Sequence, residues 1–343
     1  MKGVVKTARG HGHVELRELE LAPPGPGQVS VKVEAAGICG SDLHIYHDTI
    51  NYNIRTPVVM GHEFSGTITA LGEGADRDLS IGDRGTGEPS IYICGACDYC
   101  RGGQYNMCPD RQVMGYYHDG CFAPVVNATF VHRLPDSVSF EAGALTELLA
   151  CCVHSVIEQA GVVAGDVVAV IGPGPVGLFA SLVAMAEGGS VVLLGTSADA
   201  DRLRFAREEL GVAHTLDVQT EDPVAAVQAL TGGYGADVVV ECAGVAPAIN
   251  SAFDIVRKRG RVSLMGLPGR KLEVDIEKIP YKELQVSGGI GQRRSAWERS
   301  LRLMASGAID GEKLISHEIG LDEWQTGFEM MERQEGLKIL LRP

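Results

Sequence analysis

The most informative absences in this chain concern apolar runs, an export signal and positive charge. No stretch reaches the roughly 18 apolar residues of a membrane-spanning helix. The first residues also lack the apolar core of a signal peptide. Lysine and arginine number 30 against 44 aspartates and glutamates, which gives a net charge of −14. That balance disfavours nucleic acid and anionic membranes as main partners. We therefore expect a cytoplasmic protein with neither as its partner.

A disulfide framework is missing as well. Of nine cysteines, five are scattered without framework spacing, which agrees with a reducing compartment. The other four follow the pattern C-x2-C-x2-C-x7-C, in which short loops let four thiolates surround one zinc ion. They are Cys94, Cys97, Cys100 and Cys108. Because four sulfurs leave no position for a substrate, we predict a structural zinc that braces a lobe over residues 90–112.

The chain changes character near its middle, and its 343 residues exceed the roughly 250–300 at which one core stops growing. Up to about residue 150, runs such as Val29–Val33 and Gly66–Ala70 alternate apolar and polar residues between turns, which indicates an antiparallel β domain. Later apolar runs are separated by helical patterns, notably Val176–Glu187 and Ala200–Leu210, and predict a parallel doubly wound α/β sheet. The predicted strands are Val167–Ile171, Val191–Leu194, Asp237–Val240, Val262–Met265 and Leu284–Val286. A helical segment, Ser295–Ser306, and a tail follow.

A glycine-rich loop directly follows the first of these strands. Its sequence is Gly172-Pro-Gly174-Pro175-Val176-Gly177, which fits G-x-G-x-x-G between a strand and a helix. The first glycine permits a tight turn, the second lets a pyrophosphate approach the backbone, and the third packs helix on strand. The N–H groups at the helix start favour the phosphates. We therefore expect NAD or NADP at this loop.

The end of the next strand bears on which dinucleotide binds. An acidic residue usually bonds the adenosine ribose there, but this strand is followed by Ser197, with Arg202 nearby. A carboxylate would repel a 2′-phosphate, whereas a serine beside an arginine would not, so the pattern tilts toward NADP. Asp199 or Asp201 could still reach the ribose, and Arg202 could be a plain surface charge.

A second candidate metal set lies in the β half. The segments Cys39-Gly-Ser41-Asp42-Leu-His44 and Gly61-His62-Glu63-Phe-Ser-Gly66 together offer a thiolate, imidazoles and carboxylates, a plausible zinc set that leaves a fourth position for water or substrate. A Lewis-acid metal lowers the pKa of an alcohol, and hydride leaves an alkoxide more easily than an alcohol.

With these motifs assembled, the chain resembles the zinc-dependent medium-chain alcohol and polyol dehydrogenases over essentially its whole length. Within that family, the segment 147–154 is similar to sorbitol dehydrogenase-like members, which have proline where this chain has Leu148. The residues that carry the resemblance are GICGSDLH (37–44), GHEFSG (61–66), the four-cysteine lobe, GPGPVG (172–177) and Glu-Cys-Ala-Gly (241–244).

The resemblance implies a GroES-like, mainly antiparallel catalytic domain over 1–150 and 290–343. It also implies a Rossmann domain over 151–289, two zinc ions per chain, and a homo-dimer or homo-tetramer. Cys39, His62 and Glu63 would hold the catalytic zinc, with Glu147 as an alternative or water-bridged ligand. The resemblance further implies that Ser41 takes the alcohol proton, His44 passes it to solvent and Asp42 orients His62. Residues lining the nicotinamide pocket would include Cys242, Ala243, Gly266 and Leu267.

The function we expect is NAD(P)-linked interconversion of a secondary alcohol, a polyol or sugar derivative, with its ketone. A threonine dehydrogenase-like oxidation of an amino alcohol is the enzymatic alternative. A non-catalytic zinc or redox-sensing protein would lack some ligand or relay residues, and a zinc-free reductase of the same superfamily would lack Cys39 and His62. All of these residues are present.

Overall fold

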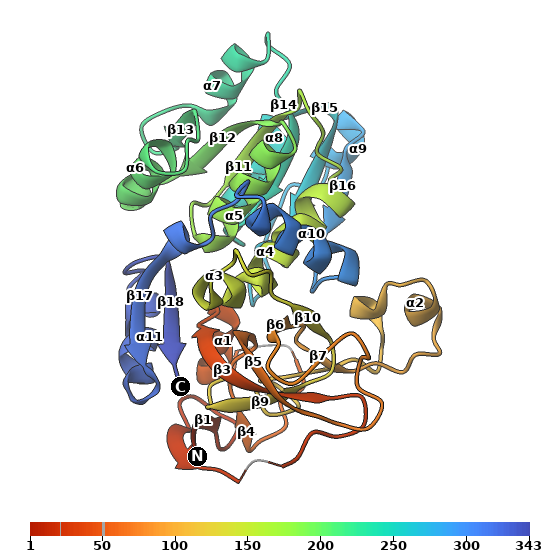
Figure 1. Cartoon of the computed structure of the whole chain (residues 1–343). Helices are drawn as coiled ribbons and strands as arrows, with labels where there is room; N and C mark the ends of the chain where they lie inside the picture. The colour runs from red at the N-terminus through yellow and green to blue at the C-terminus, as the bar shows by residue number, and fades with distance from the viewer. Residues whose placement is uncertain (21, 50–51) are drawn as a thin grey trace. The chain divides into compact units, whose positions relative to one another are not determined.

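The protein is described by a computed structural model that covers residues 1–20, 22–49 and 52–343 (Figure 1). The chain divides into two compact units. Unit 1 combines Met1–Glu147 with Gln292–Pro343, and unit 2 comprises Leu148–Gly291. Within the described ranges, no helix is long and apolar enough to cross a membrane.

Unit 1 is built on a seven-stranded sheet, in the order β10-β6-β5-β3-β18-β17 with β9 also paired to β3. Its central pair, β3 (Val29–Gly37) and β5 (Glu63–Leu71), is antiparallel. Alternation along both strands buries one face in an apolar cluster that includes Val31, Phe64 and Ile68. The antiparallel β domain predicted from the sequence is confirmed.

The register of this central pair positions the first candidate metal ligands. Gly37, the last residue of β3, pairs with Glu63, the first residue of β5. Cys39 follows the end of β3, and His62 precedes the start of β5. Two segments 23 residues apart in sequence, counting from Cys39 to His62, therefore meet at one edge of the sheet.

The remaining elements of unit 1 frame this sheet and the cysteine lobe. Its other strands are β1 (Lys2–Lys6), β2 (Val14–Glu18), β4 (Val58–Val59), β6 (Arg84–Gly87), β7 (Ser90–Tyr92), β8 (Gln112–Val113), β9 (Val125–Ala128), β10 (Val131–Arg133), β17 (Ile315–Gly320) and β18 (Lys338–Arg342). Its helices are α1 (Gly40–His47), α2 (Asp98–Arg101), η1 (Tyr105–Met107), α3 (Phe140–Ala144), α10 (Arg294–Ala305), η4 (Glu312–Leu314), η5 (Leu321–Glu323) and α11 (Trp324–Glu332). Helix α4 (Thr146–Val153) begins two residues before the boundary with unit 2.

Unit 2 is a six-stranded sheet in the order β13-β12-β11-β14-β15-β16, and every neighbouring pair is parallel. Helices α5, α6 and α8 pack on these strands, as expected for a doubly wound sheet (Figure 1). The strands are β11 (Val167–Ile171), β12 (Ser190–Gly195), β13 (His214–Asp217), β14 (Ala236–Glu241), β15 (Val256–Leu264) and β16 (Gln285–Gly288). The helices are η2 (His154–Gln159), α5 (Pro175–Ala186), η3 (Ser197–Asp199), α6 (Ala200–Glu208), α7 (Pro223–Leu230), α8 (Ala246–Ile255) and α9 (Lys278–Lys282).

The predicted parallel sheet is confirmed, with two differences in detail. Strand β13 was not predicted, because His214–Asp217 contains a single buried apolar residue, Leu216, and forms an edge of the sheet. Strand β15 begins six residues before the predicted Val262, since its first half is a charged stretch with an irregular pairing to β14.

Candidate active site and metal centres

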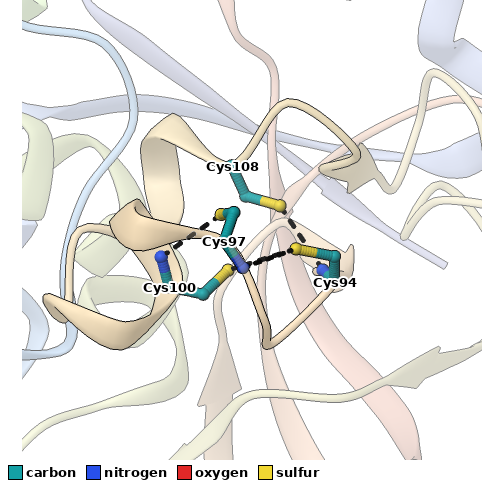
Figure 2. A group of neighbouring side chains, drawn as sticks. All are labelled: Cys94, Cys97, Cys100 and Cys108. Carbon is teal, nitrogen blue, oxygen red and sulfur yellow. Dashed lines mark hydrogen bonds between the residues drawn. The ribbon is translucent and has the colours of Figure 1, made fainter.

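The four cysteines of the lobe converge on one point. Their sulfur atoms all lie within 4.8 Å of one another, and Figure 2 shows the four side chains pointing inward. A tetrahedral zinc with Zn–S bonds of about 2.3 Å needs sulfurs about 3.8 Å apart. The Cys94 and Cys100 sulfurs lie 3.9 Å apart, too far for a disulfide and at the spacing that a zinc ion requires.

Backbone N–H groups donate to sulfur atoms in this lobe. The N–H of Cys97 donates to the sulfur of Cys94 (3.3 Å), and that of Cys100 donates to the sulfur of Cys97 (3.4 Å) (Figure 2). Backbone hydrogen bonds from Ala96 and Cys97 lower the pKa of Cys94 to about 7. Gly95 adopts a positive φ of 67°, which a side chain would disfavour, and so permits the turn between the first two ligands. The donor chemistry fits a structural zinc.

A buried carboxylate connects the lobe to the β domain. The Tyr105 hydroxyl, between the third and fourth cysteines, lies 2.9 and 2.8 Å from the two carboxylate oxygens of Glu88. The same carboxylate lies 2.9 Å from Nε2 of His132 on β10, and the ring of Tyr105 stacks on Phe130. Movement of the lobe would therefore break hydrogen bonds to a buried charge.

The second cluster contains Cys39, His62 and Glu63, whose ligand atoms lie within 4.8 Å of one another. Cys39 is the N-cap of α1, where its N–H donates to Asp42 Oδ2 at 2.9 Å. This cap fixes the direction in which the chain leaves β3 and enters the helix. His62 and Glu63 are both buried, with 5 and 0 % of their surface exposed.

The electrostatics of this cluster favour a cation. Burial lowers the pKa of His62, but the Cys39 hydrogen bond and the negative charges of Cys39, Asp42 and Glu147 raise it to about 10. Without a metal ion, the protonated imidazole of His62 balances the negative charges of Cys39, Asp42 and Glu147. A bound metal ion would supply that positive charge instead. Asp42 Oδ1 lies 3.8 Å from His62 Nδ1, and neither atom has a hydrogen-bond partner among the described residues. The expected orienting contact is therefore close, but it is not a hydrogen bond in this structure.

A lysine that the sequence analysis missed completes the cluster. Lys338 Nζ lies 2.5 Å from Glu63 Oε2 and donates to the Ile38 carbonyl at 2.9 Å. Burial lowers the pKa of Lys338, but the hydrogen bond to Glu63 and the negative charges of Glu63, Cys39 and Glu147 together raise it above its usual value, so the lysine keeps its proton. The other oxygen, Oε1 of Glu63, is buried and has no hydrogen-bond partner within the described ranges. That atom is the one available to a metal.

Glu147 lies outside the three-residue group, although it is buried nearby. The Gln292 side-chain amide donates to its carboxylate. Burial raises the pKa of Glu147, which the positive charge of His62 partly opposes. The structure thus brings Cys39, His62 and Glu63 together and places Glu147 at their margin.

One of the expected relay residues, Ser41, contacts the metal cluster, with its hydroxyl 3.4 Å from His62 Nε2. The other, His44, lies about one turn further along α1, and its Nδ1 is 3.0 Å from Thr49 Oγ1 in an exposed contact. Tyr116 was not predicted, yet its ring centroid lies 5.7 Å from that of His62, and its phenol hydrogen-bonds Ser41. Burial raises the pKa of Tyr116, so the phenol keeps its proton. No local motif distinguishes this tyrosine from its neighbour, Tyr117.

The glycine loop of unit 2 has the shape that a pyrophosphate needs. Gly172 adopts a φ of 99°, and a Cβ on Gly177 would collide with the Gly172 carbonyl. At Gly174 an added Cβ would meet no atom within 4 Å, so its backbone is open to a ligand at the start of α5. Pro175 begins that helix, where its missing N–H costs nothing. Val176 follows in the first turn.

The predicted nicotinamide residues lie beside this loop. Cys242, Ala243 and Gly244 follow β14, and an added Cβ on Gly172 would lie 3.2 Å from the Ala243 Cβ. The Glu241 carboxylate accepts hydrogen bonds of 2.8 Å from the N–H groups of Ala243 and Gly244, which holds the turn.

Gly266 and Leu267 follow the next strand, β15, and approach the same turn. The backbones of Gly244 and Gly266 pack against each other, because a Cβ added to Gly266 would collide with the Gly244 nitrogen. A Cβ added to Gly244 would lie 3.1 Å from the backbone of Leu267. The side chain of Leu267 is largely exposed, at 63 %.

The ribose end of the predicted cofactor site contains an unexpected carboxylate. The Ser197 hydroxyl donates to Asp217 Oδ2 at 2.5 Å. Arg202 lies 3.9 Å from Asp199, whose other oxygen accepts from Thr196. Asp217 escaped the sequence analysis because it ends the unpredicted strand β13.

Comparison with known proteins agrees with this arrangement. The zinc-binding dehydrogenase family model matches residues 175–306, and the alcohol dehydrogenase GroES-like domain model matches residues 25–136. The chain is 41 % identical to a sorbitol dehydrogenase of Halalkalibacterium halodurans over 100 % of this chain and 99 % of that protein. It is 36 % identical to a D-arabitol-phosphate dehydrogenase of Enterococcus avium over 99 and 97 %.

Similarity to a solved structure extends over the same length. The alcohol dehydrogenase TADH from Thermus sp. ATN1 has a TM-score of 0.89 and 33 % identity over 100 % of this chain and 99 % of that chain. The two family models and the full-length relatives therefore indicate the same kind of protein as the geometry of the metal cluster and of the glycine loop. The chain belongs to the zinc-dependent medium-chain alcohol and polyol dehydrogenases, and it is an oxidoreductase of that family.

Proposed function

We propose that this enzyme interconverts a secondary alcohol of a polyol or sugar derivative with its ketone, using NAD or NADP as hydride carrier. The observation that carries the proposal is the buried group of Cys39, His62 and Glu63, whose surroundings favour a cation. The polyol substrates named for the two curated relatives support this substrate class. Zinc at this group would lower the pKa of the substrate alcohol, and the nicotinamide would accept the hydride.

Each residue of the cluster has a distinct task in this proposal. Cys39 and His62 hold the metal, and Glu63 contributes Oε1 while its other oxygen is paired with Lys338. Ser41 accepts the alcohol proton, because its hydroxyl lies beside His62 Nε2. His44, one turn along α1, then passes that proton toward solvent.

The other parts of the proposal concern the second zinc site, Glu147 and the assembly of the enzyme. The four-cysteine lobe would hold a second, structural zinc, which makes two per chain. Glu147 would be an alternative metal ligand rather than a resting one, since Gln292 bonds its carboxylate. A homo-dimer or homo-tetramer and a cytoplasmic location stay predictions of the sequence, as does the assignment of catalysis to unit 1 and cofactor binding to unit 2.

A substrate panel tests the proposal. Turnover is followed by nicotinamide absorbance with NAD+ and NADP+, using polyols, polyol phosphates, threonine and simple alcohols. We expect activity with one or more polyols, and loss of that activity in Cys39→Ala and His62→Ala with dinucleotide binding retained. His317→Ala, which alters an exposed histidine of β17, is the matched control and should remain active. Full activity in either cluster variant would remove the metal role, and threonine alone as substrate would favour the amino-alcohol alternative.

Metal analysis of the same samples separates the two zinc sites. We expect two zinc ions per wild-type chain and one per Cys39→Ala chain. Two ions in both proteins would show that Cys39 does not bind zinc.

A further inference from the structure

The residues that distinguish NAD from NADP are expected at the carboxyl ends of strands β11, β12 and β13 of unit 2. Strands β11, β12 and β13 are neighbours with parallel register, so their carboxyl ends lie in one row (Figure 1). The glycine loop follows β11, and Thr196 and Ser197 follow β12. A Cβ on Gly195 would lie 2.9 Å from Pro173 of that loop, which shows that the two turns touch. The adenosine ribose of a bound dinucleotide belongs at this corner.

Every hydrogen-bond donor of the Thr196-Ser197 turn is already bonded to an acceptor of the protein. The Thr196 N–H and hydroxyl both donate to Asp199 Oδ2, at 2.9 and 2.8 Å. The Ser197 N–H donates to Gln219 Oε1 at 3.2 Å. The Ser197 hydroxyl donates to Asp217 Oδ2 at 2.5 Å. A serine hydroxyl has one hydrogen, so Ser197 is left with lone pairs to offer.

This donor pattern suits a ribose hydroxyl and not a phosphate. A 2′-hydroxyl can donate to the free lone pair of Ser197, whereas a phosphate monoester has acceptor oxygens and about −1.5 to −2 charges at pH 7. A 2′-phosphate would therefore find no free donor on Thr196 or Ser197.

The charges at the corner act in the same direction. The Ser197 hydrogen bond and the Gln219 N–H lower the pKa of Asp217, so this carboxylate is ionised at neutral pH. Glu221 lies beside it, with Oε1 at 3.4 Å from the Asp217 N–H. Arg202 contributes a cation, and the charge of Asp199, at 3.9 Å, offsets it. The local sum is negative, which disfavours a dianion.

We propose that Asp217, acting directly on the ribose corner and through Ser197, makes this enzyme selective for NAD+ over NADP+. This inference rests on the proposed dinucleotide site. It reverses the preference for NADP expected from Ser197 and Arg202, because that expectation was formed without the carboxylate that ends β13. Asp217 is thus a specificity-determining residue on the strand beside the usual position.

Calorimetric binding of nucleotides, without substrate, tests the inference. NAD+, NADP+, 5′-ADP and 2′,5′-ADP are titrated into wild type, Asp217→Asn and Asp254→Asn. Asp254 lies at the end of α8, the helix that starts after the carboxyl end of β14 and runs back along the sheet, and it is paired with Lys278 at 2.6 Å, so its variant changes the net charge equally at a position outside the corner. We expect wild type and Asp254→Asn to bind NAD+ at least tenfold more tightly than NADP+. In Asp217→Asn we expect this ratio to fall about tenfold, equivalent to ~1.4 kcal/mol.

The outcomes distinguish failure of the proposed dinucleotide site from failure of the NAD+ selectivity alone. If wild type binds none of the four nucleotides, the proposed dinucleotide site fails and the inference fails with it. If wild type binds NADP+ as tightly as NAD+, or Asp217→Asn leaves the ratio unchanged, the inference alone is overturned. Circular dichroism checks that Asp217→Asn is folded. If Asp217→Asn does not fold, the ratio of NAD+ to NADP+ affinity in wild type still tests the inference. Ser197→Ala is a second variant, in which the affinity for NAD+ should fall and that for NADP+ should not.

Discussion

Replacing Lys338 with methionine should destabilise unit 1 strongly, because it leaves the Glu63 carboxylate buried without its cation. The two side chains are 3 and 0 % exposed, and Lys338 Nζ also donates to the Ile38 carbonyl. Removing one member of a buried ion pair typically costs about 3–5 kcal/mol, far more than the pair contributes net. Methionine keeps most of the apolar volume, so the loss should come from charge rather than from a cavity.

Urea unfolding followed by tryptophan fluorescence measures this loss. Both tryptophans of the chain, Trp297 and Trp324, belong to unit 1, so the signal reports the unit that contains the pair. In chelator-treated protein we expect Lys338→Met to lower the free energy of unfolding by about 3 kcal/mol or more. With zinc present the loss should be smaller, because a metal ion beside Glu63 would replace the missing positive charge.

Two comparisons distinguish this explanation from a general loss of packing. Lys32→Met removes an exposed lysine of β3 that is paired with Glu34, and it should cost less than about 1 kcal/mol. The double variant Glu63→Gln/Lys338→Met should recover much of the loss, since no orphaned charge remains. Additive effects of the two substitutions, or a Lys338→Met protein as stable as wild type, would refute the reasoning.

Three further predictions concern neighbouring contacts. Tyr116→Phe removes the hydrogen bond to Ser41, so kcat/KM should fall about tenfold, a loss of ~1.4 kcal/mol, and its pH profile should shift while zinc content stays unchanged; an unaltered profile and rate would contradict the contact. Cys97→Ser should release the structural zinc on chelator treatment before the catalytic one, as counted by metal analysis; retention of two ions would argue against the lobe site. Tyr105→Phe leaves Glu88 short of donors and should lower the free energy of unfolding by about 1–3 kcal/mol in the fluorescence assay, and no change would contradict the anchoring of the lobe.

The parts of the site that the sequence revealed are those whose geometry is local. The four cysteines of the lobe and the three glycines at 172–177 are close in sequence, so their spacing alone constrains where the side chains and backbone must lie. Cys39 and His62 were recognisable as candidates because soft and imidazole ligands are chemically distinctive. The structure brings the ligand atoms of the four cysteines, and those of Cys39 and His62, within 4.8 Å of one another, while the roles assigned to these residues stay predictions.

The residues that escaped prediction come from distant segments. Lys338 reaches Glu63 across 275 positions of sequence through the β18–β3 pairing, and a lysine in the run Lys338–Arg342 looks like an ordinary strand end. Asp217 was hidden by the failure to predict β13, whose single buried apolar residue gives no periodic pattern. Such contacts depend on strand order and register, and neither composition nor spacing determines them.

The register between β3 and β5 determines where Cys39 lies relative to His62 and Glu63 in the metal cluster. The pairing contains two irregular steps, one of them between Val33 and Ala35, before it reaches Gly37 opposite Glu63. One residue inserted or deleted in this short stretch would displace Cys39 by about 3.3 Å along the strand. Metal–ligand distances tolerate only about 0.2 Å. Length changes here should therefore abolish zinc affinity even where the sheet survives, so this segment should be the least tolerant of chain-length variation in any engineered version of the enzyme.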